Sequence, residues 1–562
     1  MKQIKHLLTE HGEKINGSEY DFYPRPSLVR DSFFSLNGEW ELIAEEQSYK
    51  INVPYPPESL LSGVNKVFRD GTPLIYKKSF NLPNGFAREK TILHFGAVDG
   101  ACSVYLNNSF LGMHIGGYDN FSFDITDKLL SENEIRVEVV DTLKGFVYPY
   151  GKQSYKRGGM WYTPVSGIWQ SVWLESVSNE YIKGIKIDTR NNTAKIRFDG
   201  ISSGEVFLDG KCFPIINGAS KITIEEPIYW SPENPHLYYF TAKCVGDEIK
   251  SYFALRDLEI KVIDGVSRLC LNGEPYFFNG VLDQGYFSDG IFTPASSEGY
   301  KNDIIKMKGC GFNTLRKHIK IEPDLFYYYC DKYGMIVFQD MINSGGYSFL
   351  IDTAFPTVFF KKGISHFASK KRQEAFIKTG ERMLKLLHNH PCVCYYTIFN
   401  EGWGQFSTNY CYKHFIELDK TRIFDTASGW FKTGCTDVYS EHVYFKKVNL
   451  KCKGDKPLVL SEFGGYSFKI PEHSFNLKRT YGYRFYNDGK NFETALMKLY
   501  REEIKPNIAK GLCATVFTQV SDIEDETNGL LTYDRKLLKV DPKLMCDIKK
   551  ELDEVFENQF KK

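Results

Sequence analysis

The feature that most constrains the fold is a change of rhythm in the chain near residue 260. Before this point the sequence consists of short runs in which apolar and polar residues alternate, such as residues 101–106, separated by Asn/Gly turns. Beyond it, strand-like apolar segments alternate with helix-like segments for about 300 residues. The first pattern predicts antiparallel β domains, and the second predicts a parallel (β/α)8 barrel.

The first 260 residues divide into two strand-rich blocks. Residues 33–178 read as an all-β sandwich, and residues 180–258 have the length of a small immunoglobulin-like sandwich. The second block offers no catalytic cluster, and a chain of 562 residues is too long for a single core. We therefore expect separate domains, with the chemistry in the barrel.

Within the barrel region the pattern predicts individual elements. Helices are expected over 301–309, 324–333 and 373–389, and strands over 314–316, 335–340 and 393–399. An irregular stretch at 343–369 is too long for an ordinary β-α turn and is a candidate active-site loop.

Two strands of this region end in a glutamate beside a glycine. Residues 397–403 contain Glu401 and residues 459–465 contain Glu462, far enough apart in sequence for two β-α units. Double displacement at a glycosidic bond needs one carboxylic acid to protonate the leaving oxygen and one carboxylate to attack the anomeric carbon. The pair therefore predicts a glycosidase.

The composition excludes several classes of partner. Lys and Arg number 71 and Asp and Glu 70, and a net charge of +1 favours neither nucleic acid nor an anionic membrane. The 13 cysteines form no CxxC pair, and the N-terminus carries charge where a secretory signal needs an apolar run. We expect a soluble cytoplasmic protein with reduced thiols.

Several motifs together resemble glycoside hydrolase family 2, the family of β-galactosidases, β-glucuronidases and β-mannosidases. They are residues 36–40, 96–99, 161–170 and 277–281, followed by the two glutamate segments. The resemblance implies a multidomain fold with a jelly-roll β-sandwich, an immunoglobulin-like β-sandwich and a C-terminal (β/α)8 TIM barrel. The implied boundaries are 1–178, 179–259 and 260–562.

The same resemblance assigns roles to residues of the barrel. It makes Glu401 the acid/base after the fourth strand and Glu462 the nucleophile after the seventh, with retention of configuration. It lets Asn400 hold the sugar 2-hydroxyl. The further substrate-binding residues that we expect are Arg316, His318, Asp283, Asp340, Trp403, His442, Tyr444 and Gln519.

Alternatives stay open for some of these residues. Asp340 also fits a role in positioning Arg316 or His318 by hydrogen bonding. Trp403 and Tyr466 fit barrel packing as well as an aglycone platform, and Trp161 and Trp169 fit the jelly-roll core better than a second sugar site.

Departures from the family pattern concern the sugar. β-Glucuronidases carry Asn-x-Lys before a Gly-x-x-Thr-x-Asp-Arg stretch, where this chain has Glu526 and Asn528, although Lys317 or Lys320 could substitute. Large β-galactosidases hold magnesium with Glu-x-His, which residues 340–345 lack, and Thr518-Gln519 replaces a common tryptophan. No metal or cofactor is expected.

The resulting functional hypothesis is a retaining exo-acting β-glycosidase, most similar to β-galactosidases. β-Glucuronidase-like or β-mannosidase-like activity remains the alternative, as does a non-catalytic carbohydrate-binding protein. The expected partner is a small glycoside or oligosaccharide, and a homo-oligomer is possible.

Overall fold

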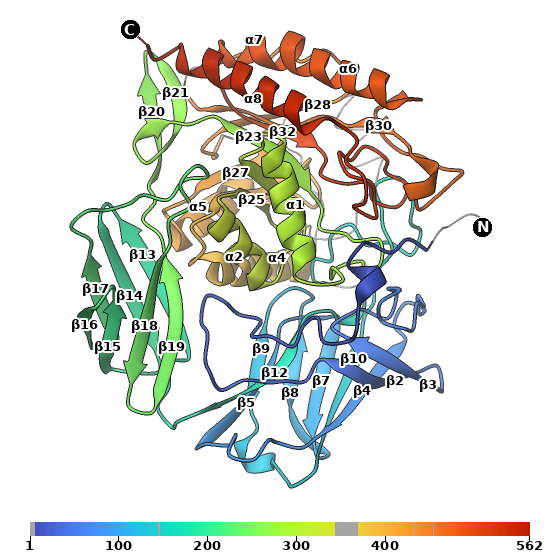
Figure 1. Ribbon diagram of the computed structural model, residues 1–562, viewed down its shortest axis with the longest axis vertical. Coiled ribbons are helices and arrows are strands. Elements are labelled where there is room, and N and C mark those ends of the chain that lie inside the picture. The colour runs from blue at the N-terminus through green and yellow to red at the C-terminus, as the bar shows by residue number, and fades with distance from the viewer. Residues whose placement is uncertain (1–5, 144–146, 343–368, 433, 453–454, 562) are drawn as a thin grey trace.

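The computed structural model describes residues 6–143, 147–342, 369–432, 434–452 and 455–561. Most of the candidate loop at 343–369 lies outside these ranges. Three bodies make up the chain: a β-sandwich at the bottom of Figure 1, a second β domain at its left, and a barrel ringed by helices above them. This arrangement confirms the predicted multidomain fold.

The jelly roll packs two antiparallel sheets around one apolar core. One sheet has the order β3 (Gln47–Val53), β2 (Gly38–Ala44), β4 (Pro73–Phe80), β10 (Asn133–Val140), β7 (Ala101–Leu106), β8 (Ser109–Ile115). The other has β1 (Phe34–Ser35), β12 (Val172–Val177), β5 (Lys90–Phe95), β9 (Phe121–Asp124), and β6 (Val98–Asp99) pairs with β11 (Gly167–Ile168). Asn107 and Asn108 form the β7–β8 hairpin turn because asparagine tolerates their φ values of 50° and 63°.

The immunoglobulin-like domain contains strands in which buried and exposed side chains alternate, most clearly β14. Along β14, Ala194, Ile196 and Phe198 are buried while their neighbours face solvent, as a half-buried strand requires. The strand order is β13 (Gly184–Arg190), β14 (Thr193–Asp199), β17 (Ala219–Thr223), β16 (Lys211–Ile216), β15 (Ser203–Leu208), β18 (Tyr238–Cys244), β19 (Asp247–Phe253).

The barrel consists of eight parallel strands in sequential order. They are β23 (Phe278–Asp283), β24 (Thr314–Lys317), β25 (Ile336–Asp340), β26 (Val393–Asn400), β27 (Ile423–Ser428), β28 (Tyr439–Val443), β29 (Leu458–Gly464) and β32 (Leu512–Thr518). Asp437 N, just before β28, donates to Phe424 O of β27 at 3.0 Å, which brings the ends of the sheet together. The strands are buried along nearly their whole length, as expected of a parallel sheet covered by helices.

The helices outside the strands agree with the predicted rhythm. They are α1 (Glu298–Gly309), α2 (Asp324–Tyr333), α4 (Lys370–Leu387), α5 (Thr408–Leu418), α6 (Gly489–Leu499), α7 (Lys505–Ile508) and α8 (Pro542–Glu557). Two small sheets, β20 (Leu258–Ile263) with β21 (Val266–Leu271) and β22 (Glu274–Pro275), and β30 (Tyr466–Phe468) with β31 (Arg484–Tyr486), complete the domain. Among the described residues, none of the helices is long and apolar enough to cross a membrane.

Helix α8 shows how the sequence specifies such an element. Asp541 caps its first turn by accepting a hydrogen bond from Lys543 N, and Pro542 occupies the first helical position, where no amide hydrogen is needed. Its buried side chains, at helical spacing, are Met545, Ile548, Leu552 and Phe556.

Two tryptophans lie at the contact between the jelly roll and the barrel. Trp169 packs on Phe292 with ring centroids 5.1 Å apart, and Trp161 stacks on Trp403 at 5.3 Å with an interplanar angle of 20°. Trp169 belongs to the apolar cluster of the barrel and Trp161 packs against that cluster, so their assignment to the jelly-roll core was wrong. The reason is physical: large aromatic side chains stabilise the domain contact as well as they stabilise a sandwich interior.

Candidate active site

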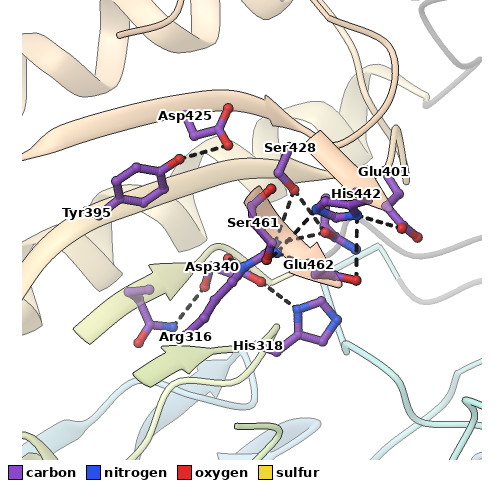
Figure 2. Close-up of polar contacts among 12 residues, drawn as sticks. Arg316, His318, Asp340, Tyr395, Glu401, Asp425, Ser428, His442, Ser461 and Glu462 are labelled. Carbon is purple, nitrogen blue, oxygen red and sulfur yellow. Dashed lines mark hydrogen bonds and ion pairs between the residues drawn. The ribbon is translucent and has the colours of Figure 1, made fainter. Parts of the chain in front are cut away.

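The carboxyl ends of five barrel strands bring polar side chains to one place, as Figure 2 shows. Arg316 comes from β24, Asp340 from β25, Asn400 from β26, His442 from β28 and Glu462 from β29. All are buried. A cluster of this kind at the carboxyl end of a barrel is the usual place of its chemistry.

Glu401 occupies a strained turn directly after β26. Its φ is 50°, a left-handed conformation that side chains other than Asn and Asp seldom adopt. Gly402 follows with φ 78°, and a Cβ there would lie 2.2 Å from the Phe431 ring, so only glycine fits. Backbone strain of this kind is common at functional sites, and here the Glu401 carboxylate contacts His442 (Figure 2).

The two predicted glutamates face each other. Carboxylate oxygens of Glu401 and Glu462 and a ring nitrogen of His442 all lie within 4.8 Å of one another. His442 Nδ1 is 2.7 Å from Glu401 Oε1 and 3.5 Å from Glu462 Oε2. Retaining glycosidases hold their carboxyl groups about 5 to 5.5 Å apart, and inverting ones about 6.5 to 9.5 Å.

Glu462 is held in its ionised form. Arg316 Nη1 donates to its Oε1 at 2.9 Å, and the Tyr444 hydroxyl donates to its Oε2. Burial opposes ionisation, but His442, Arg316, His318 and the Tyr444 hydrogen bond lower the pKa of Glu462 to about 2. A carboxylate that stays charged at neutral pH suits a nucleophile.

Arg316 connects most of the cluster. Its Nε donates to Asp340 Oδ1 at 2.9 Å, and its Nη2 donates to Asn400 Oδ1 at 2.9 Å and Ser428 Oγ at 3.1 Å. The five N–H groups of one planar guanidinium can fix several acceptors at once, which lysine cannot do. Arg316 thereby sets the position of both Asn400 and the nucleophile.

Asp340 has the positioning role that the sequence left open. Besides Arg316 it contacts His318, with 2.6 Å between Asp340 Oδ2 and His318 Nδ1. Burial and the charge of Lys152 lower the pKa of His318 to about 4, so its ring is neutral at pH 7. His318 Nε2 has no hydrogen bond among the described residues and is available to a ligand.

Asn400 presents one side of its amide to the cluster and leaves the other side open. Its Oδ1 accepts from Arg316 and, at 3.0 Å, from Ser428 Oγ, so the Nδ2 group points away from these partners. Within the described part of the chain Nδ2 has no hydrogen-bond acceptor. This orientation agrees with the predicted contact to a sugar hydroxyl.

A second ion-pair cluster lies at the ends of β23 and β24. Lys317 Nζ binds Asp283 Oδ2 at 2.6 Å and Glu322 Oε1 at 2.9 Å, while Lys320 Nζ binds Glu322 Oε2 at 2.9 Å. Asp283 Oδ1 accepts from Gly285 N, so both of its oxygens are already engaged. Lys317 and Lys320 therefore bind buried carboxylates and do not offer a free charge to a sugar carboxylate. Asp283 is a member of this ion-pair cluster, with no unbonded oxygen left for the predicted contact to sugar hydroxyls.

Gln519 positions a neighbouring carboxylate. Its Nε2 donates to Glu526 Oε2 at 2.6 Å and Asn528 Oδ1 at 2.7 Å, and its Oε1 accepts from Gln284 Nε2 at 2.6 Å. The Tyr162 hydroxyl of the jelly roll donates to the same Glu526 oxygen at 2.9 Å. Both polar atoms of the Gln519 side chain, Nε2 and Oε1, are thus bonded to neighbouring side chains of the protein.

Aromatic residues near the glutamates are mostly packing groups. Trp403 is 3% exposed and stacks on Trp161, and Tyr466 is also 3% exposed and accepts a hydrogen bond from Arg484. Tyr444 stacks on Tyr483 with ring centroids 3.9 Å apart. An aglycone platform on Trp403 or Tyr466 has no exposed ring face to support it.

Sequence reasoning missed three residues of the site. Ser428 binds Arg316 and Asn400, and its place at the end of β27 was a usable signal, since other strand ends were selected on that ground. Lys152 and Tyr162 come from the jelly roll, and nothing in the local sequence marks them. Their contribution depends on how the two domains pack.

The close set of Glu401, His442 and Glu462 is chemically better suited to proton transfer than to a hard cation. Magnesium prefers six oxygen ligands in octahedral geometry, whereas here Arg316 already neutralises Glu462. The donor set offers only two carboxylates beside one imidazole.

A jelly roll, an immunoglobulin-like domain and a barrel with paired glutamates define the architecture of multidomain carbohydrate-active barrel proteins. Residues 24–178 match the sugar binding domain of Glycosyl hydrolases family 2, residues 176–256 match its middle domain, and residues 260–538 match its TIM barrel domain. The chain belongs to glycosyl hydrolase family 2.

Individual relatives are distant. The chain is 24% identical to a β-galactosidase of Thermoanaerobacter pseudethanolicus over 72% of its own length and spans 55% of that protein. A solved β-D-glucuronidase structure from Dictyoglomus thermophilum superposes with a TM-score of 0.73 at 17% identity, covering 95% of this chain and 98% of that one. A family 2 β-galacturonidase of Eisenbergiella tayi bound to galacturonate gives 0.68 at 18% identity, covering 95% and 98%. These structures share the fold.

Proposed function

We propose that the protein is a retaining, exo-acting β-glycosidase that works by double displacement. The observation that carries the proposal is the approach of the Glu401 and Glu462 carboxylates within 4.8 Å, which leaves no room for a water between nucleophile and sugar. Family membership and the low pKa of Glu462 support the same mechanism.

In the first step the Glu462 carboxylate attacks the anomeric carbon while the bond from this carbon to the leaving oxygen breaks. Glu401 gives its proton to that oxygen, and a covalent glycosyl-enzyme forms. In the second step Glu401 takes a proton from water, the water oxygen bonds to the anomeric carbon, and Glu462 leaves as a carboxylate. Arg316 and Tyr444 hold Glu462 in line, and Asn400 Nδ2 binds the sugar next to the reacting carbon.

For the sugar we favour a neutral, β-galactoside-like glycone. The chain has Glu526 and Asn528 where the family resemblance would give a uronate-binding pair, and a second carboxylate there repels a uronic acid. Lys317 and Lys320 are engaged in buried ion pairs. The name of the Thermoanaerobacter relative supports this preference, whereas the names of the two solved structures support a uronide.

A panel of nitrophenyl β-glycosides tests the proposal: galactoside, glucoside, mannoside, glucuronide and galacturonide. We expect release from the galactoside, with the β-anomer of the free sugar seen first by NMR. Glu462→Gln serves as the matched inactive control. First formation of the α-anomer excludes double displacement, and binding of sugars without release from any substrate favours a carbohydrate-binding protein. The cytoplasmic location and a homo-oligomer remain predictions.

A further inference from the structure

A buried lysine of the jelly roll lies beside the barrel site. Lys152 lies between β10 and β11 and is 8% exposed. In the described part of the chain its ammonium makes neither a hydrogen bond nor an ion pair. Its Nζ is 5.9 Å from the Tyr162 ring centroid and 5.8 Å from that of Trp403, two residues after Glu401. Buried lysines are rare unless they are paired.

The ring contact with Trp403 places Lys152 beside the turn that carries Glu401. Burial lowers the pKa of Lys152, while the charges of Glu526, Glu462 and Glu401 act in the opposite direction. Its charge also lowers the pKa of His318. A sugar bound at Glu401 and Glu462 would therefore lie near this ammonium.

Glu526 presents a complementary open atom. Its Oε2 accepts from Tyr162, from Gln519 and, at 3.1 Å, from Gln284, whereas its Oε1 accepts from none of the described residues. The fixed oxygen holds the carboxylate in one orientation. The other oxygen is therefore a positioned acceptor. Tyr162 links this carboxylate to Lys152, because the Tyr162 hydroxyl bonds Glu526 and the centroid of the Tyr162 ring lies 5.9 Å from Lys152 Nζ.

We propose that Lys152 and Glu526 together bind a hydroxyl group of the glycone, so that the jelly roll contributes a specificity-determining residue to the barrel site. A sugar hydroxyl both donates and accepts, and can therefore donate to Glu526 Oε1 while accepting from Lys152 Nζ. A carboxylate on the sugar could use only the ammonium and would be repelled by Glu526. This inference rests on the proposed glycosidase function and assigns it a neutral sugar.

The test compares Lys152→Met with wild type on nitrophenyl β-galactoside and on its 4-deoxy and 6-deoxy analogues. Loss of a charged hydrogen bond should lower kcat/KM on the parent by about 10- to 100-fold. The loss should shrink to about twofold on the analogue that lacks the contacted hydroxyl, because the partner is then already absent. Lys156→Met, at an exposed lysine four residues further on, is the control and should behave as wild type.

Lys152→Gln, which keeps a hydrogen-bond donor, repeats the measurement if the methionine variant does not fold. An equal loss on all three sugars, or no loss, overturns the inference. A wild-type preference for a glucuronide or galacturonide that Lys152→Met removes overturns the hydroxyl assignment in favour of a carboxylate. If the wild type releases no nitrophenol at all, the proposed function fails. Calorimetry then measures the affinity of methyl β-galactoside for Glu462→Gln and for the double variant Glu462→Gln/Lys152→Met. This comparison tests the contact between Lys152 and the sugar alone, and equal affinities overturn it.

Discussion

The two sides of the active site differ in how their polar atoms are used. On the nucleophile side, Arg316, Asp340, His442 and Glu462 bond to one another. On the opposite side, Lys152 Nζ and Glu526 Oε1 have neither a hydrogen-bond nor an ion-pair partner in the described part of the chain.

The difference separates chemistry from selection. The mutual hydrogen bonds of Arg316, Asp340, His442 and Glu462 fix these four side chains before substrate arrives, so little free energy is spent on reorganising them during reaction. Open donors and acceptors on the opposite side acquire partners only when the correct sugar binds, and an incorrect sugar leaves them unsatisfied. Variants of the nucleophile side should therefore change the rate on every substrate. Variants of the opposite side should change which substrates the enzyme prefers.

The largest effect is expected for Glu462→Gln. Removing the nucleophile should lower kcat on the order of 10⁴-fold or more on all glycosides while sugar binding remains. Stopped assays with the nitrophenyl panel and calorimetry with the free sugar measure the two quantities. A residual rate that depends on the sugar would contradict a general role for this side.

A smaller, leaving-group-dependent effect is expected for Glu401→Gln. The loss in kcat should be about 10² to 10⁴-fold on alkyl glycosides, whose leaving oxygen needs a proton. The loss should be much smaller for the glycosylation step with dinitrophenyl glycosides, because dinitrophenolate leaves without being protonated. Equal losses across leaving groups of different pKa would show that Glu401 is not the acid.

Arg316→Lys should have an intermediate effect that depends on pH. Lysine cannot bond Asp340, Asn400 and Glu462 together, so we expect kcat/KM to fall by about 10- to 100-fold. The wild-type nucleophile, with its pKa lowered to about 2, stays ionised as pH falls towards that value. A weaker partner raises this pKa, so the acid limb of kcat/KM should move to higher pH in the variant. An unmoved acid limb would separate Arg316 from the ionisation of Glu462.

The smallest effect is expected from metal removal. Residues 340–345 lack the Glu-x-His pair, so dialysis against a chelator should change kcat by less than about twofold. Activity that disappears and returns only with magnesium would mean that ligands from other segments had been missed.

The nucleophile side could be predicted from sequence, and the opposite side could not. Glu401, Glu462 and Arg316 each follow or end an apolar strand, and the barrel geometry collects strand ends at one place. Lys152 comes from an irregular segment of another domain, and no periodicity links it to Glu526. The position of Lys152 depends on how the two domains pack. The sequence does not contain this information directly, and for the same reason Trp161 was assigned to the wrong core.

Lys317 and Lys320 show a related limit. Their residue type and their position beside a strand end allowed a sugar-carboxylate contact, but Asp283 and Glu322 bind them in the interior. Sequence lists the charges of a site, whereas only packing shows which of them are already paired. The substrate contacts of Asn400 and His318 stay predictions with a compatible geometry.

The Trp161–Trp403 stack has a consequence for how such proteins diversify. Because this stack fastens the jelly-roll segment that carries Lys152 to the turn after Glu401, exchanging the jelly roll between relatives would also change the surroundings of the active site. A chimera that joins this barrel to a foreign jelly roll would inherit the catalytic glutamates and lose one wall of the pocket. Recombination at the domain boundary is therefore a route to new sugar preferences that leaves the reaction itself unchanged.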